Sequence, residues 1–210
     1  MTQTPPENSV LLIIDLQNDF CSGGGLPVPG GEEIVPLVNR LSPAFPATVL
    51  TQDWHPPGHS SFASAHQEAS PYALIEASYG PQVLWPDHCI QGTGGADFHS
   101  DLETKNADLI MRKGFRPAID SYSAFQENDR QTSTGLAGYL RDRGIEHITL
   151  CGLALDFCVK WSALDAVANG FGATVLTDAC RAIDLDGSKA AANSEMAAAG
   201  ITLATSDTVN

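Results

Sequence analysis

The sequence is poor in basic residues and has no long apolar segment. Its 210 residues include 11 Lys and Arg against 25 Asp and Glu, a formal net charge of −14. Such a balance repels nucleic-acid phosphates and anionic lipid headgroups, so neither nucleic acid nor membrane is expected as a partner. The apolar run Val10–Ile14 is far too short for a membrane span or a signal-peptide core. We therefore expect a cytoplasmic protein.

Common thiol and phosphate motifs are also absent. The five cysteines form no C-x-x-C pair, which disfavours redox pairs and thiolate zinc knuckles. The run Gly23–Gly25 lacks dinucleotide-loop spacing and no Gly-Lys-Ser/Thr follows, which favours a flexible entrance loop over a phosphate cradle. Free cysteines are usually small buried side chains. We interpret Cys21, Cys89, Cys151 and Cys180 in this way.

Short apolar runs rich in Val, Ile and Leu alternate with segments of helical periodicity. The runs are nearly continuous, as expected for parallel strands covered on both faces. Several of the helical segments end at glycine, which is common at helix C-termini. The expected strands are 10–14, 47–51, 107–111, 147–151, 173–177 and 201–204, and the expected helices are 32–41, 135–143, 157–169 and 189–199. This order predicts a three-layer α/β/α sandwich with a mainly parallel central sheet, in one domain spanning residues 1–210.

Reactive side chains follow four of the predicted strands. In open α/β sheets, ligands bind outside the carboxyl ends of the strands. We therefore expect an acid, a metal-ligand cluster, a lysine and a cysteine to meet at one edge of the sheet. In chain order, the residues are Asp15, then Asp53 with His55, then Lys113, then Cys158.

Cys158 differs from the other cysteines because it lies at the predicted start of a helix. Asp156 is the expected N-cap, which places Cys158 in the first turn, where backbone N–H groups and the positive helix end favour a thiolate. The preceding turn Gly152–Ala154 could bring further N–H groups to an oxyanion. The alternative interpretation of Cys158 is a buried thiol that packs the helix against the sheet.

Asp15 and Lys113 each have an ordinary interpretation beside a catalytic one. Asp15 is either a turn residue or a general base with a raised pKa. Lys113 either extends to solvent or faces Cys158, where its ammonium would stabilise a thiolate. Together the three side chains supply a base, a nucleophile and cationic support. This combination favours a cysteine hydrolase.

The interval 54–106 has no clear periodicity, and long irregular stretches inside a domain are usually functional. Just before it and within it are candidate metal ligands. Asp53 and His55 project to one side of an extended segment, and His88 could supply a third ligand. Two imidazoles and a carboxylate suit one divalent metal ion: Zn²⁺, Fe²⁺ or Mn²⁺. Three neighbouring residues lie either near this metal or only along the loop: His59, Ser60 and Ser61.

Four apolar or aromatic residues are candidates for the walls of a pocket that holds an aromatic ring: Phe20, Leu26, Trp85 and Tyr122. Most such residues are simply part of the hydrophobic core, which is the alternative for each of them. A pocket of this kind would indicate a small aromatic molecule as the partner of the protein.

These residues lie in segments that resemble the bacterial nicotinamidase/pyrazinamidase group of the isochorismatase-like hydrolases. The resemblance runs nearly end to end in the order of that family, and it implies the isochorismatase-like fold. It also implies hydrolysis of nicotinamide to nicotinate and ammonia, and of pyrazinamide. The matching segments are Asp15–Phe20 (DLQNDF), Thr51–Pro56 (TQDWHP), Trp85–Cys89 (WPDHC), Lys113–Gly114 (KG) and Cys151–Val159 (CGLALDFCV).

The resemblance also assigns roles to residues. It implies a triad of Asp15, Lys113 and Cys158. It implies a metal held by three side chains, Asp53, His55 and His88. It further implies an oxyanion hole from the N–H groups of Ala154 and Cys158, and a cis peptide bond between Leu153 and Ala154.

Two alternatives stay open at this point. One is an amidohydrolase for carbamoyl or ureido substrates on the same fold, although relatives with those substrates generally lack the metal ligands. The other is a non-catalytic metal-binding α/β protein in which Cys158 is a redox sensor. Isochorismatase itself is disfavoured by the cysteine. The sequence is compatible with a homo-oligomer and does not determine the oligomeric state.

Overall fold

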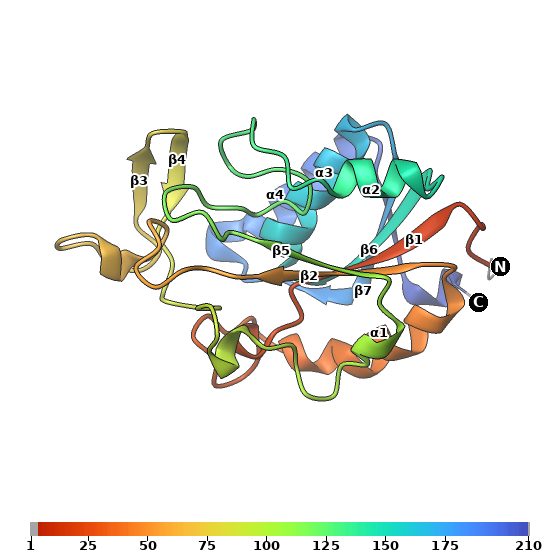
Figure 1. Cartoon of the computed structure of the whole chain (residues 1–210), viewed down its shortest axis with the longest axis horizontal. Helices are drawn as coiled ribbons and strands as arrows, with labels where there is room; N and C mark the ends of the chain where they lie inside the picture. Colours follow the sequence, from red (N-terminus) through yellow and green to blue (C-terminus); the bar gives the residue numbers. More distant parts are fainter. Residues whose placement is uncertain (1–3, 210) are drawn as a thin grey trace.

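The structure is a computed structural model, and it describes residues 4–209 (Figure 1). Six parallel strands form the central sheet in the order β5-β2-β1-β6-β7-β8. All six predicted strands are present, and their boundaries move by up to four residues. They are β1 (Ser9–Ile14), β2 (Thr48–Asp53), β5 (Leu109–Lys113), β6 (His147–Leu153), β7 (Gly172–Arg181) and β8 (Thr202–Ala204).

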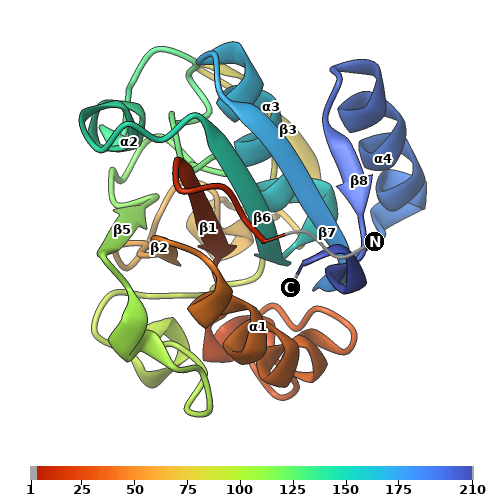
Figure 2. The same ribbon diagram turned by 90° about the vertical axis from the view of Figure 1, so that its right-hand side faces the viewer.

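Helices cover both faces of this sheet, so the predicted three-layer sandwich is confirmed (Figures 1 and 2). The chain moves across the sheet in one direction from β1 to β2 and in the other from β6 to β8. Right-handed crossovers therefore place α1 on one face and the later helices on the opposite face. The helices are α1 (Val35–Leu41), α2 (Leu136–Asp142), α3 (Lys160–Ala168) and α4 (Ser188–Ala198).

Two predicted helices begin differently from the sequence expectation. The segment predicted from residue 32 starts as a 3₁₀ turn, Gly31–Ile34, before α1. The segment predicted from residue 157 starts as a π-helical turn, Leu155–Val159, that leads into α3. Single π-helical turns occur frequently at functional sites. Cys158 lies in this turn.

The interval 54–106 contains an antiparallel hairpin that the sequence did not predict, formed by β3 (Leu74–Ala77) and β4 (Gly80–Val83). It stands away from the central sheet in Figure 1. Leu74 is 69% exposed, and Pro81 lies within β4, so the segment lacks an apolar face and carries a residue that disfavours strands. Only Gln82 of β4 is buried, and its side chain reaches toward the site described below.

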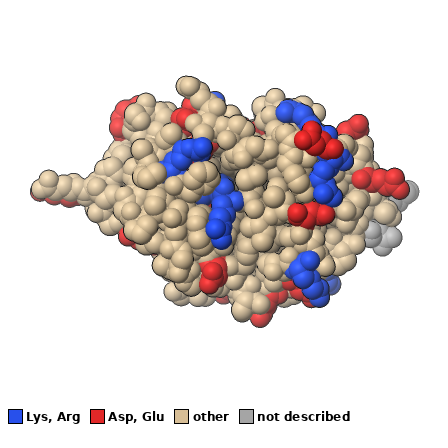
Figure 3. Space-filling model, in the orientation of Figure 1, with Lys and Arg blue, Asp and Glu red and all other residues tan. Residues whose placement is uncertain are grey.

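The described residues also show the length of the apolar helices and the distribution of charge on one face. None of the helices in residues 4–209 is long and apolar enough to cross a membrane. On the face shown in Figure 3, the Lys and Arg side chains form separate small groups rather than one continuous basic patch.

Candidate active site

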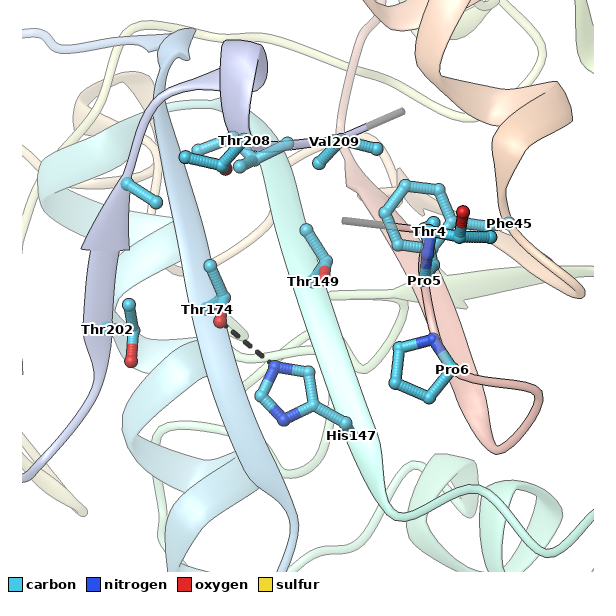
Figure 4. A pocket seen from close by; sticks show the side chains of 12 residues that line it. Thr4, Pro5, Pro6, Phe45, His147, Thr149, Thr174, Thr202, Thr208 and Val209 are labelled. Atoms are coloured by element: carbon cyan, nitrogen blue, oxygen red, sulfur yellow. Dashed lines mark hydrogen bonds between the residues drawn. The ribbon is translucent and has the colours of Figure 1, made fainter. Parts of the chain in front are cut away.

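Two cavities are candidates for the functional site. The wider one, about 300 Å³, lies over the amino-terminal halves of β6 and β7 and against β8, where Thr149, Thr174 and Thr202 lie on adjacent strands (Figure 4). His147 contacts Thr174 there, with 2.9 Å between Nε2 and Oγ1. No acidic, lysine or cysteine side chain of the described residues lines it. Its described lining therefore offers none of the thiol, carboxylate and ammonium groups that the sequence places together.

The narrower cavity, about 20 Å³, lies at the carboxyl edge of the sheet and contains Cys158. All four residues predicted from the sequence as pocket walls line it, and their contact with a substrate stays a prediction. Sequence reasoning missed three further lining side chains. The four predicted wall residues are Phe20, Leu26, Trp85 and Tyr122, and the missed ones are Asp120, Phe157 and Ile183.

The ammonium of Lys113 joins the reactive groups at this edge. Its Nζ atom lies 2.8 Å from Asp15 Oδ2 and 2.8 Å from Asp53 Oδ1, and it donates to the Ser121 carbonyl at 2.9 Å. Cys158 Sγ is 3.6 Å away. Lys113 is fully buried, and although burial lowers the pKa of its amine, the two carboxylates raise that pKa well above its ordinary value. Lys113 is therefore a buried cation beside Cys158 and does not extend to solvent.

The position of Asp15 is determined by its place in the chain and by Thr51. It follows the central strand β1 directly, with a φ of +45°, and is fully buried. The Thr51 hydroxyl donates to Asp15 Oδ1 at 2.6 Å. Burial raises the pKa of the Asp15 carboxyl, and the opposing effect of Lys113 does not cancel that rise. A carboxylate with a raised pKa is a stronger proton acceptor than an ordinary aspartate.

The surroundings of Cys158 favour the thiol, in contrast to the thiolate that its place at the start of a helix led us to expect. Burial raises the pKa of Cys158 well above its ordinary value. Lys113 lowers it, but Asp15, Asp53 and Asp120 add further upward shifts.

The expected N-cap role of Asp156 is also wrong. Asp156 lies inside the π-helical turn, and the N-cap position is occupied by Ala154. The Asp156 carboxylate instead accepts hydrogen bonds from the N–H groups of Ile183 and Asp184, at 3.1 and 2.7 Å, and from the Ser188 hydroxyl. It thereby fixes the loop after β7 against the turn that carries the cysteine.

The chain before this turn passes very close to β1. The peptide bond between Leu153 and Ala154 is cis, as the family resemblance implied. Gly152 has a φ of +118°, and a Cβ atom there would lie 2.1 Å from the Ile14 carbonyl oxygen. Only glycine fits this position. The glycine run Gly23–Gly25, expected as a flexible loop, is likewise constrained, because a Cβ on Gly24 would lie 2.4 Å from Asp19 Cα.

Three side chains beside Lys113 form a group with the geometry of a metal site. Asp53 Oδ2 lies 3.3 Å from His55 Nε2 and 3.6 Å from His88 Nε2. Ligands about 2.0–2.1 Å from a tetrahedral ion are separated by about 3.3 Å, so the group fits one divalent metal. Each imidazole Nδ1 lies near a backbone carbonyl, 2.9 Å from Gly114 and 2.8 Å from Pro86, which leaves Nε2 directed at the shared position.

The chain is similar to known proteins over nearly its whole length. The family description "Isochorismatase domain" matches residues 9–208. The chain belongs to this family. Among curated relatives in the family, a nicotinamidase from Acinetobacter baylyi is 52% identical over 92% of this chain and 91% of its own length. The family resemblance read from the sequence is therefore confirmed.

Solved structures in the isochorismatase family agree over nearly the full length. A nicotinamidase/pyrazinamidase from Acinetobacter baumanii is 52% identical with a TM-score of 0.94, covering 95% of this chain and 97% of its own. PnC1 from L. infantum, in complex with nicotinate, is 38% identical with a TM-score of 0.88, covering 100% and 99%. A pyrazinamidase from Pyrococcus horikoshii in complex with zinc is 36% identical with a TM-score of 0.77, covering 95% and 99%.

The side chain of His59, in the loop after His55, lies beside the metal group. His59 Nδ1 lies 2.7 Å from the Ser61 hydroxyl, and His59 Nε2 lies 2.8 Å from the Arg116 carbonyl. The His59 ring packs against the His55 ring at 4.4 Å between centroids. Both nitrogens of His59 contact protein groups, and His59 also forms, with His55 and Asp120, a second group whose spacing could hold a metal ion. The backbone N–H of Ser60 bonds to Pro117.

Asp120 is the functional candidate that sequence reasoning missed most clearly. One of its oxygens lies within 4.8 Å of ligand nitrogens of His55 and His59. Tyr122, two positions further along the chain, was predicted as a wall residue. An acidic residue so close to a predicted wall residue is the sequence signal that could have identified Asp120. Two residues on an extended segment project to the same side, so Tyr122 in the wall places Asp120 beside it.

Proposed function

We propose that this protein is a nicotinamidase, a cysteine amidohydrolase that converts nicotinamide to nicotinate and ammonia and that also accepts pyrazinamide. The observation that carries the proposal is the position of the Lys113 ammonium, which lies 3.6 Å from Sγ of Cys158 in the cavity wall and 2.8 Å from Asp15. Beside it lies a three-ligand metal group. The nicotinamidases named above, which are similar over nearly the whole chain, support the substrate assignment.

The reaction starts from the thiol. Asp15 accepts the proton of Cys158 as the sulfur attacks the carboxamide carbon, and a C–S bond forms. The N–H groups of Ala154 and Cys158 hold the oxyanion. Asp15 returns the proton to the amide nitrogen, the C–N bond breaks, and ammonia leaves. Water, with Asp15 again accepting a proton, then cleaves the thioester to nicotinate and the free thiol.

Lys113 makes this proton transfer feasible. Its ammonium stabilises the sulfur anion as it forms and holds the Asp15 carboxylate in place, because it contacts both groups. A resting thiol is compatible with this sequence of steps, since the proton leaves sulfur only when a carbonyl carbon is in position to take the electron pair. The thiol is also less prone to oxidation than a permanent thiolate.

Asp53, His55 and His88 would hold one divalent metal ion, Zn²⁺, Fe²⁺ or Mn²⁺, and the zinc complex of the Pyrococcus horikoshii relative supports this. When bound, the metal supplies a ligand position for the pyridine nitrogen. Phe20, Leu26, Trp85 and Tyr122 surround the ring. Because the cavity is only about 20 Å³, wall side chains move as the ring enters.

The metal group and the intact triad argue against the two alternatives, a carbamoyl or ureido amidohydrolase and a non-catalytic metal-binding protein. We further propose that residues 1–210 form a single domain and that the protein acts in the cytoplasm. A homo-oligomer stays open as a prediction from the sequence.

Ammonia release from nicotinamide tests the proposal directly. We expect turnover by the wild-type protein, loss of at least about a thousandfold in C158A, and unchanged metal content of C158A by elemental analysis. The matched control is C151A, which removes another buried thiol, on β6, and should retain turnover. A wild-type protein that releases no ammonia, or a C158A variant that keeps its activity, would overturn the assignment.

A further inference from the structure

Asp120 is a carboxylate in the wall of the active-site cavity that the mechanism above does not use. Its side chain is buried and lines the cavity together with Cys158 and Tyr122. One of its oxygens lies within 4.8 Å of a nitrogen of His55, which places it on the metal side of the cavity. A buried charge inside a ligand cavity acts on whatever charge the ligand carries.

The hydrogen-bond partners of Asp120 are neutral. Its Oδ1 accepts from the Ser121 N–H at 2.8 Å, and its Oδ2 accepts from Gln82 Nε2 at 2.7 Å. Among residues 4–209, no Lys or Arg nitrogen lies within 4.0 Å of this carboxylate. Its negative charge is therefore stabilised by dipoles and is not cancelled by an ion pair.

Gln82 fixes the orientation of this carboxylate. The Gln82 amide oxygen accepts from Tyr79 at 3.1 Å and from Asn128 at 3.2 Å, so its Nε2 is the end that faces Asp120. The same Nε2 contacts the Tyr122 hydroxyl at 3.2 Å. Burial raises the pKa of Tyr122 well above its ordinary value, and the nearby Asp120 raises it further. The charge of Asp120 thus acts on the cavity wall.

Substrate and product of the proposed reaction differ in charge at one group. The carboxamide is neutral, whereas the carboxylate product is an anion. The carboxylate of Asp53 lines the cavity and that of Asp15 lies nearby, and both contact the ammonium of Lys113. Asp120 adds a third carboxylate, and no ammonium of the described residues is in contact with it. At low local dielectric it opposes the binding of an anion and leaves a neutral amide almost unaffected.

We infer that Asp120 is a specificity-determining residue that weakens the binding of aromatic carboxylates relative to neutral aromatic ligands of the same shape, and so favours release of the acid product. This inference rests on the proposed function. In this role, the Asp120 carboxylate in the cavity wall discriminates between ligands by their charge.

The test compares two ligands on metal-loaded protein by calorimetry, so it does not depend on turnover. Nicotinate carries the negative charge, and pyridine-3-methanol has the same ring and is neutral. In D120N we expect the dissociation constant of nicotinate to fall about tenfold and that of pyridine-3-methanol to change less than about twofold. D120S removes the same charge with a smaller side chain and should give the same selective change, which keeps the test decisive if D120N does not fold.

The matched control is D178N. Asp178 also accepts two hydrogen bonds, from the Ser206 N–H and hydroxyl, and it does not line the cavity. It should leave both constants unchanged. Parallel changes for the two ligands in the Asp120 variants would show a merely structural role, and an unchanged nicotinate constant would also refute the inference. Absence of nicotinamide hydrolysis in the wild type would instead remove the proposed function.

Discussion

Replacing Lys113 with methionine tests the central electrostatic argument, because it deletes the cation and keeps the length of the side chain. Lys113 is fully buried and contacts Asp15 and Asp53, both at 2.8 Å. Without it, two buried carboxylates face each other with no compensating charge. Removing one partner of a buried ion pair costs about 3–5 kcal/mol. For a chain of this size, about 1 kcal/mol shifts the Tm by roughly 2–4 °C, so we expect a decrease of about 6–20 °C.

The pH dependence of this decrease follows from Asp15. Its folded-state pKa is raised by burial, and Lys113 opposes that rise. In K113M the pKa rises further, so the folded protein holds the proton at low pH and must lose it as pH increases. A group with a raised folded pKa stabilises the fold below its unfolded pKa and loses that contribution as pH rises through the folded pKa. The Tm deficit of K113M should therefore be smaller at pH 5 than at pH 8.

Differential scanning calorimetry of metal-free wild type, K113M and K105M at both pH values measures these effects. Lys105 is 76% exposed and lies 3.3 Å from Glu103, so K105M removes an exposed ion pair and should leave the Tm almost unchanged. If K113M lost no more thermal stability than K105M, Lys113 would not be the buried cation that organises the site, and the reasoning would fail.

Two further predictions concern the metal ligands and the base. In G114A, a Cβ atom at φ +67° would lie 2.5 Å from His55 Cε1, so we expect at least about tenfold weaker metal binding in a competitive titration. The control is G138A, where a Cβ atom meets nothing within 4 Å and metal should bind as in the wild type. Equal affinities in the two variants would contradict the role of His55. For the base, burial raises the pKa of Asp15 above 3.8, so kcat/KM should fall with decreasing pH along an acid limb of the pH profile that lies above that value. The T51V variant removes a hydrogen bond that favours the carboxylate, so it should move this limb to higher pH. An acid limb at the same pH in T51V would count against Asp15 as the base.

The fold was largely predictable because its signal is local. The run Val10–Ile14 is apolar on both faces, and only the centre of a parallel sheet buries such a strand completely. The β3–β4 hairpin was missed for the opposite reason. Its exposed Leu74 and its Pro81 break the pattern that normally identifies strands, and the Gln82 side chain contacts Asp120, 38 positions further along the chain.

The sequence predicted which residues meet at the candidate site, but it did not predict their charges and pKa shifts. Asp15, Lys113 and Cys158 follow strands whose carboxyl ends share one edge, so topology alone brings them together. The protonation state of Cys158 could not be predicted, because it depends on burial and on carboxylates from three other segments of the chain. The same holds for Asp120, whose partners Gln82 and Ser121 are visible only in the folded chain.

The sequence by itself determined the parallel sheet, the order of its elements and which residues lie at its carboxyl edge, since apolar periodicity and chain order carry that information. Only the tertiary structure decided the charge of each group there, the direction of each imidazole and the place of the hairpin beside the cavity. Those properties depend on distances of a few ångströms between side chains that are up to about 140 positions apart in the chain, as Asp15 and Cys158 are.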